Sequence, residues 1–200
     1  GKVYTDLYSG ISVVNAGHCN PEVAEAAKAQ IDKLIHCGTY VYYAPTVADF
    51  AEKLAEVAPG RLQKTFFGNG GAEANECGMR MAKQYTKKQE FIALQGSFHG
   101  RSLATLSITG NKARKKGGGP YIPGVAFNPA PYCYRCGFDM SYPSCDLHCA
   151  KYLERTIQYD TSDTIAAFVA ETIMGEGGII VPPKEFFKEI KKILDQYGIL

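Results

Sequence analysis

The sequence predicts an α/β fold in which a mostly parallel sheet carries helices on its flanks. Two short apolar runs, residues 90–94 and 164–172, have the length of buried strands. Amphipathic helical patterns alternate with such runs along the chain, as expected for strands joined by crossover helices. With 200 residues, of which 46% are hydrophobic, the chain is long enough to enclose a large core.

Two helices are predicted near the N-terminus. In residues 20–38, Asn20 is a suitable N-cap, and apolar residues then recur at helical spacing. Residues 45–60 repeat this design, with Thr46 and Asp49 spaced as in a capping box. Both segments therefore read as helices with one apolar face.

The remaining elements follow in order. Residues 64–67 read as a short strand that leads into a glycine cluster, and residues 72–86 read as a helix. After the strand at 90–94, residues 101–110 predict a helix of a few turns. Residues 183–198 predict a long amphipathic helix that ends at its final glycine.

Residues 117–149 interrupt this rhythm with prolines and turn formers, and we expect an irregular excursion over the surface. Four cysteines lie within it at the spacing C-x₂-C-x₈-C-x₃-C: Cys133, Cys136, Cys145 and Cys149. Such a cluster suits a tetrahedral zinc site, but partly buried free thiols explain it as well. The spacing between the two pairs is shorter than in common zinc modules, so we assign no metal ligand from the sequence.

Composition limits the functional classes. The formal net charge is +2, which argues against a dedicated nucleic-acid binder despite the basic run at residues 111–116. No apolar stretch approaches the length of a membrane span, and no signal peptide opens the sequence. Seven cysteines without a secretory signal favour free thiols in a cytoplasmic protein.

The glycine cluster in residues 66–76, FFGNGGAEANE, is typical of an anion site at a helix N-terminus. A Walker loop is absent, and the dinucleotide pattern G-x-G-x-x-G fails because Glu73 occupies the place of its third glycine. Two interpretations remain: a strand-to-helix turn that binds nothing, and a seat for a phosphate monoester such as that of pyridoxal phosphate.

Two further stretches carry candidate site residues. Phe98 and His99 lie in a turn between glycines, where an aromatic side chain would stack on a flat cofactor ring. Glu171 ends an apolar strand, where open α/β sheets place ligands, and Glu176 follows in a glycine-rich loop. A structural histidine and a pair of loop-capping acids are the simpler alternatives.

Taken together, these stretches resemble the class III (ω-amino acid type) pyridoxal-phosphate aminotransferases. The similarity spans essentially the whole chain: residues 6–23 resemble the family's N-terminal region, 69–76 its phosphate loop, 97–110 its ring-stacking segment and 169–178 its acidic strand. The resemblance implies the large domain of fold-type I enzymes, incomplete at the C-terminus. It also implies a boundary between residues 1–45, an N-terminal segment at the substrate pocket, and residues 46–200, the first part of the cofactor domain.

The resemblance implies roles for individual positions. The cofactor-binding residues are expected to be Gly70, Gly71, Ala72, Phe98, His99 and Glu171. Phe98 would stack on the pyridine ring, while Glu176 and Tyr43 would lie at the substrate pocket. Position 70 departs from the family, which commonly has Ser or Thr there, so one hydroxyl contact to the phosphate is missing.

The function implied is amino transfer from an amino acid or ω-amino acid to a 2-oxo acid, in a homodimer. The family's aspartate that pairs with the pyridine nitrogen and its lysine that binds the cofactor covalently would follow Leu200, so no catalytic residue is assigned within the chain. A non-catalytic chain that binds pyridoxal phosphate or a full-length subunit is the alternative.

Overall fold

The computed structural model describes all 200 residues, and their contacts divide the chain into two units, Gly1–Thr65 and Phe66–Leu200. The division follows contacts and falls later than the functional boundary expected at residue 45. That functional boundary stays a prediction.

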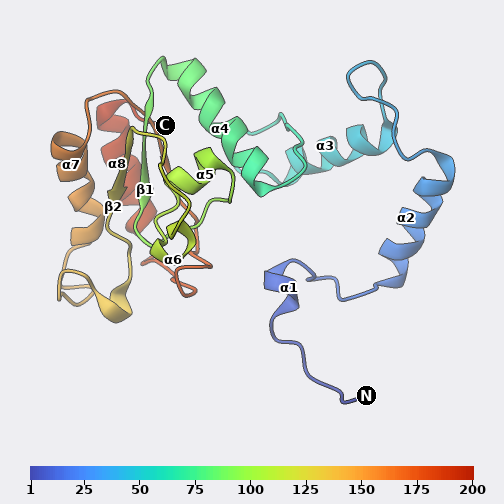
Figure 1. Cartoon of the computed structure of the whole chain (residues 1–200), viewed down its shortest axis with the longest axis horizontal. Coiled ribbons are helices and arrows are strands. Elements are labelled where there is room, and N and C mark those ends of the chain that lie inside the picture. The colour runs from blue at the N-terminus through green and yellow to red at the C-terminus, as the bar shows by residue number, and fades with distance from the viewer. The chain divides into compact units, whose positions relative to one another are not determined.

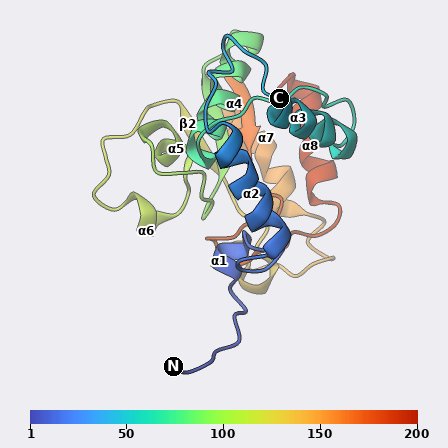
Figure 2. The same ribbon diagram turned by 90° about the vertical axis from the view of Figure 1, so that its right-hand side faces the viewer.

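The first unit consists of three helices without buried residues: α1 (Ser9–Ser12), α2 (Pro21–Lys33) and α3 (Pro45–Val57). Figure 2 shows α2 and α3 as separate helices. The Asn20 cap is confirmed, because its side-chain oxygen accepts hydrogen bonds from the N–H groups of Glu22 (3.0 Å) and Val23 (3.2 Å).

The capping box predicted for the helix at residues 45–60 is wrong. Helix α3 begins at Pro45, its N-cap is Ala44, and no side chain caps it. Proline suits the first helical position because its φ is fixed and it has no N–H to satisfy. The helix therefore begins two residues too early for Thr46 to be its N-cap.

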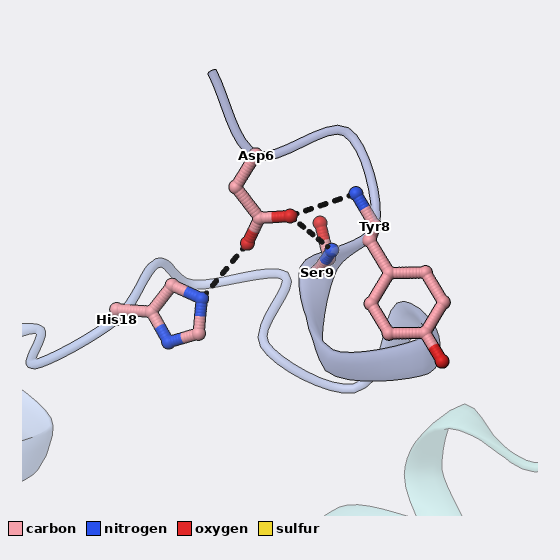
Figure 3. Close-up of polar contacts among 4 residues, drawn as sticks. All are labelled: Asp6, Tyr8, Ser9 and His18. Carbon is pink, nitrogen blue, oxygen red and sulfur yellow. Dashed lines mark hydrogen bonds and ion pairs between the residues drawn. The ribbon is translucent and has the colours of Figure 1, made fainter. Parts of the chain in front are cut away.

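Ahead of α2, the side chain of Asp6 joins Tyr8, Ser9 and His18 in a polar cluster, called here the Asp6 clip (Figure 3). The carboxylate of Asp6 accepts hydrogen bonds from the N–H groups of Tyr8 (2.8 Å) and Ser9 (2.9 Å) and contacts Nε2 of His18 at 2.9 Å. These contacts, led by the one with His18, lower the pKa of Asp6 to about 2. The clip thus depends on the ionised carboxylate.

The second unit contains a three-stranded parallel sheet in the order β2-β1-β3, which confirms the predicted fold class. Its elements in chain order are α4 (Gly71–Thr86), β1 (Glu90–Leu94), α5 (Leu103–Ile108), α6 (Lys112–Lys115), β2 (Val125–Asn128), the 3₁₀ turn η1 (Cys133–Arg135), α7 (His148–Asp160), β3 (Ile165–Val169) and α8 (Phe186–Tyr197).

Helices cover both faces of the sheet (Figure 1). Successive residues of β1 point to opposite faces, so Ile92 and Leu94 pack with α7 and α8, whereas Phe91 and Ala93 pack with α4 and α5. Because both faces are covered, β1 is apolar at nearly every position and fully buried from Phe91 onward. This central strand fixes the loops that follow it.

Two expectations along the chain need correction, and one long helix was not expected. Residues 64–67 form no strand, because a strand needs a hydrogen-bonded neighbour and none of the three paired strands reaches them. The excursion at 117–149 is not irregular throughout, since β2 lies inside it. Helix α7 was not predicted, although its first residues overlap the end of that segment.

The end of the chain continues the sheet. After α8, which Gly198 ends in the left-handed conformation as predicted, Leu200 exchanges hydrogen bonds with β3. The N–H of Phe168 donates to the carbonyl of Leu200 at 2.8 Å. The N–H of Leu200 donates to the carbonyl of Ala166 at 3.4 Å. No helix in the structure combines the length and the hydrophobicity needed to cross a bilayer.

Candidate functional site

The glycine cluster places the start of helix α4 next to open space. Gly70 is its N-cap with an extended backbone, and the helix begins at Gly71, one residue before the predicted start. A Cβ built on Gly70 or Gly71 would meet no atom within 4 Å. The first N–H groups of the helix, including that of Ala72, have no intrahelical partner and carry the positive end of the helix dipole. This end of α4 can accept an anion.

The acidic residue in the first turn does not occupy that space. The carboxylate of Glu73 reaches back to accept a hydrogen bond from the N–H of Asn69 at 2.5 Å. It thereby secures the loop that enters the helix, as the Glu of a capping box does.

The turn after β1 is held by its neighbours on every side. Within it, Phe98 is half-buried, whereas His99 is buried. The N–H of His99 donates to the hydroxyl of Thr109 at 3.0 Å, and the hydroxyl of Ser97 accepts from the N–H of Gly110 at 3.1 Å. The predicted ring-stacking segment is therefore a fixed turn.

Helix α4 packs directly onto this turn. The side-chain amide of Asn75 donates to the carbonyl of His99 at 2.7 Å. A Cβ at Gly100 would lie 2.9 Å from the Cβ of Ala72 and 2.5 Å from the hydroxyl of Thr105, and its φ is +140°. Only glycine allows the two segments to approach this closely, so the N-terminus of α4 lies directly against the Phe98–His99 turn.

Glu171 joins the third stretch to this site. One carboxylate oxygen accepts from the N–H of Phe98 at 2.9 Å, and the other accepts from the N–H of Gly175 at 2.9 Å. Glu171 follows β3 and thus ties the loop after β3 to the turn after β1. Glu171 therefore caps these loops, which is the simpler alternative that the sequence offered for it, and its role at the cofactor stays a prediction.

The imidazole ring of His99 has one nitrogen whose hydrogen-bonding capacity is unused. Its Nε2 is buried without a hydrogen-bond partner. Burial lowers the pKa of His99, and the nearby charge of Glu171 opposes that shift only in part. A neutral imidazole with an unsatisfied nitrogen marks a place where a bound group would gain a hydrogen bond.

Glu176 forms an ion pair within the second unit. Its carboxylate accepts from Nη2 (2.6 Å) and Nε (3.0 Å) of Arg114 on α6. These hydrogen bonds and the charge of Arg114 lower the pKa of Glu176. Arg114 is a residue that the sequence reasoning missed, although it lies in the basic run at residues 111–116, which is hence partly engaged in a contact.

The sheet topology explains why these residues meet. From β1 the chain moves to β2 on one side, and it then crosses to β3 on the other. The loops after β1 and β3 thus leave towards opposite faces, since α5 packs on one face and α8 on the other. In open α/β sheets, ligands bind at such a switch point, beyond the carboxyl ends of the strands.

A separate cavity in the second unit lies away from these residues. A cavity of about 240 Å³ between α4, α5 and β2 is lined by residues such as Met79, Phe91 and Ile122 and by none of the predicted site residues. Tyr43 is fully exposed in the first unit, before α3, and its part in a substrate pocket stays a prediction.

Comparison with known proteins gives a consistent result. The family model described as aminotransferase class-III matches residues 1–200. The chain is 36% identical over 201 residues to the leucine/methionine racemase of Thermococcus litoralis and 37% identical over 200 residues to the acetylornithine aminotransferase of Methanopyrus kandleri. Both alignments cover 100% of this chain, but 45% and 46% of those proteins.

A solved structure agrees with the sequence relatives. A thermostable (S)-enantioselective ω-transaminase from Thermomicrobium roseum superposes with a TM-score of 0.91 at 35% identity, over 98% of this chain and 46% of that one. The chain therefore spans about half the length of the relatives that it matches.

Proposed function

The chain belongs to the class-III aminotransferases, a family that depends on pyridoxal phosphate, and we propose that it forms the cofactor-binding part of an enzyme that transfers an amino group to a 2-oxo acid. The donor is an amino acid or an ω-amino acid. The observation that carries the proposal is the meeting of the N-terminus of α4, the Phe98–His99 turn and Glu171 at the switch point of the sheet.

In this proposal the cofactor phosphate binds at the start of α4. Gly70, Gly71 and Ala72 offer backbone N–H groups beside open space, and Glu73 is turned away towards Asn69. Backbone donors and the helix dipole suffice to hold a phosphate, although position 70 lacks a hydroxyl. A variant that places a side chain there, Gly71→Val, should weaken cofactor binding more than Gly78→Val, which lies farther along the same helix with nothing within 4 Å.

The buried residues of the site fit the rest of the cofactor. Phe98 offers a half-buried ring for stacking, held in place by Glu171. The orphaned Nε2 of His99 would gain a hydrogen-bond partner from a bound polar group. When bound, pyridoxal phosphate supplies the electron sink for the reaction.

The chain's own residues hold the loops of the site in place and neutralise charge within it. Glu171 keeps the turn after β1 and the loop after β3 at a fixed separation. Glu176 is proposed to lie at the substrate pocket, where Arg114 neutralises its charge and so limits repulsion of a substrate carboxylate. Buried and neutral, His99 provides a hydrogen-bonding group without a charge.

We further propose that the catalytic lysine lies outside residues 1–200. None of the hydrogen bonds or ion pairs of Phe98, His99 and Glu171 involves a lysine. Residues 1–200 alone should therefore show no turnover above that of the free cofactor. After incubation with pyridoxal phosphate and borohydride reduction, one stoichiometrically labelled lysine within 1–200, together with turnover, would contradict this part of the proposal.

The main test uses the protein expressed from its complete gene. Amino transfer is measured from a panel of donors, including amino acids, 4-aminobutyrate, acetylornithine and simple amines, to pyruvate or 2-oxoglutarate. The proposal requires formation of the new amino acid together with the oxo product of the donor. Loss of optical activity in the donor without an oxo product would indicate a racemase instead, and cofactor binding without turnover would indicate a non-catalytic chain.

Two further properties belong to the proposal. We propose a homodimer, because apolar side chains on α2 and α3, such as Val23, Ile31 and Phe50, are largely exposed in the first unit. All seven cysteines are free, which supports a location in the reducing cytoplasm. Sedimentation of the protein from the complete gene tests the dimer.

A further inference from the structure

The four cysteines of the segment 130–149 converge on one small cavity. Cys133, Cys136, Cys145 and Cys149 all line it, together with Ala130, Pro131, Tyr132, Phe138, Met140, Tyr142 and His148. Its volume is about 20 Å³, room for a single small species. Apart from the sulfur atoms and His148, the lining is largely aromatic or apolar.

Local backbone structure presents the cysteines in two pairs. The 3₁₀ turn η1 begins at Cys133 and leads to Cys136, whose carbonyl accepts from the N–H of Asp139 at 3.1 Å. The sequence Cys-x-x-Cys-Gly of this turn is the spacing found in zinc knuckles. In the second pair, the carbonyl of Cys145 accepts from the N–H of His148 at 3.0 Å, and Cys149 lies in the first turn of α7.

The sulfur atoms lie near enough to influence one another. Burial raises the pKa of Cys149 to about 11, and the neighbouring Cys133 and Cys145 contribute to that rise. Burial likewise raises the pKa of Cys133, with Cys145 and Cys136 as further causes. Burial therefore favours the thiol forms of Cys133 and Cys149 while no cation is present.

The segment around the cavity has little regular secondary structure of its own to stabilise it. Around the cavity it contains one short 3₁₀ turn and otherwise irregular backbone. Its contacts with the rest of the unit include apolar packing of Tyr132 and Leu147 on the core and a hydrogen bond from the side-chain amide of Asn128 to the carbonyl of Cys149 at 3.0 Å. Small segments without a core of their own are commonly stabilised by a structural metal.

We propose that Cys133, Cys136, Cys145 and Cys149 bind one zinc ion, which fastens this segment to the start of α7. On binding, the four thiols release four protons to solvent and the four thiolates surround Zn²⁺, with no change of oxidation state. As they stand, no three Cys, His, Asp or Glu side chains are arranged to hold an ion, so the thiols must turn inward by side-chain rotation. Four thiolates favour zinc over magnesium or calcium.

The test measures metal in the protein from its complete gene, purified without chelators or a metal-affinity column. Elemental analysis should find about one zinc per chain. The double variant Cys133→Ser/Cys136→Ser should lose it, whereas the matched control Cys19→Ser/Cys37→Ser, with both changes in the first unit, should keep it. A zinc content near zero in the unaltered protein, or iron in its place, would overturn the proposal.

A second measurement does not depend on whether the variant folds. In the unaltered protein, cobalt exchanged for zinc should give the visible bands and the sulfur-to-metal charge transfer of a tetrahedral thiolate site. Peptide mapping after alkylation should find the four cysteines unlinked once the metal is removed. Disulfides between them in freshly purified protein, or octahedral cobalt spectra, would contradict it. Neither result bears on amino transfer, so the two proposals fail separately.

Discussion

The carboxylate of Glu171 accepts a hydrogen bond from the backbone N–H of Phe98 at 2.9 Å, although 73 positions separate the two residues in sequence. Its second oxygen is bonded to the N–H of Gly175. The loops after β1 and β3 are therefore joined by one side chain, and the candidate site depends on it.

Replacing Glu171 with alanine removes both hydrogen bonds and leaves two backbone donors unsatisfied. We expect the free energy of unfolding to fall by about 1–3 kcal/mol and cofactor retention to weaken. Urea denaturation measures the first effect and dialysis of the bound cofactor the second. Glu154→Ala on the exposed side of α7 is the matched control. Equal stability of the two variants would show that the link contributes nothing.

Phe98→Ala should lower cofactor affinity by about 1–3 kcal/mol, because it removes a half-buried aromatic ring from the proposed stacking position. Titration of the cofactor-free protein from the complete gene, followed by fluorescence, gives the affinity. Phe66→Ala serves for comparison, since that ring is 66% exposed. Unchanged affinity in Phe98→Ala would remove the stacking role.

His99 should make stability depend on pH. Burial lowers its pKa in the folded chain, with Glu171 opposing, whereas the unfolded chain titrates near ~6.5. Below that pH the unfolded chain binds a proton that the folded chain does not. The free energy of unfolding is therefore highest above pH ~6.5 and decreases as the pH falls towards the lowered pKa of folded His99. In cofactor-free protein, His99→Gln should flatten this slope below pH ~6.5. An identical slope in both proteins would argue against a buried neutral His99.

Gly100→Ala should destabilise the second unit by about 2 kcal/mol or more, because the new Cβ would collide with Thr105 and Ala72 at a φ of +140°. Gly78→Ala, inside α4 with nothing within 4 Å, should be neutral or slightly stabilising. Thermal unfolding of both variants makes the comparison. A Gly100→Ala protein as stable as Gly78→Ala would refute the close approach.

The Asp6 clip should open at low pH. Its pKa is about 2 when folded and ~3.9 when unfolded, so its contribution is present above ~3.9 and is lost as the pH falls through about 2. The amide resonances of Tyr8 and Ser9, which donate to this carboxylate, should shift over that range in NMR spectra. In Asp6→Asn the same resonances should not titrate.

Much of the fold was predictable where one pattern dominates. The apolar runs of β1 and β3 and the amphipathic pattern of α8 identified those elements because their burial leaves a clear mark in the sequence. β2 escaped prediction because it has only four residues, of which two are buried, in a segment rich in proline. The run at 64–67 misled because strand propensity alone provides no pairing partner.

The site shows the same limit. Its glycines and Phe98 were recognisable from residue type and spacing, and the structure brings them together with Glu171. The Arg114–Glu176 pair was not predictable, because nothing local indicates a contact across 62 positions. The same holds for the orphaned nitrogen of His99, since only the surrounding atoms decide whether a polar group is satisfied.

The strand order β2-β1-β3 also has a kinetic consequence. β1 cannot pair with β3 until the intervening chain, which includes β2 and α7, has been closed into a long loop. Loop closure of this kind is slow compared with the formation of helices such as α4. During refolding, helical circular dichroism should therefore recover before the chain can bind its cofactor, and competence for binding should appear only in the last phase.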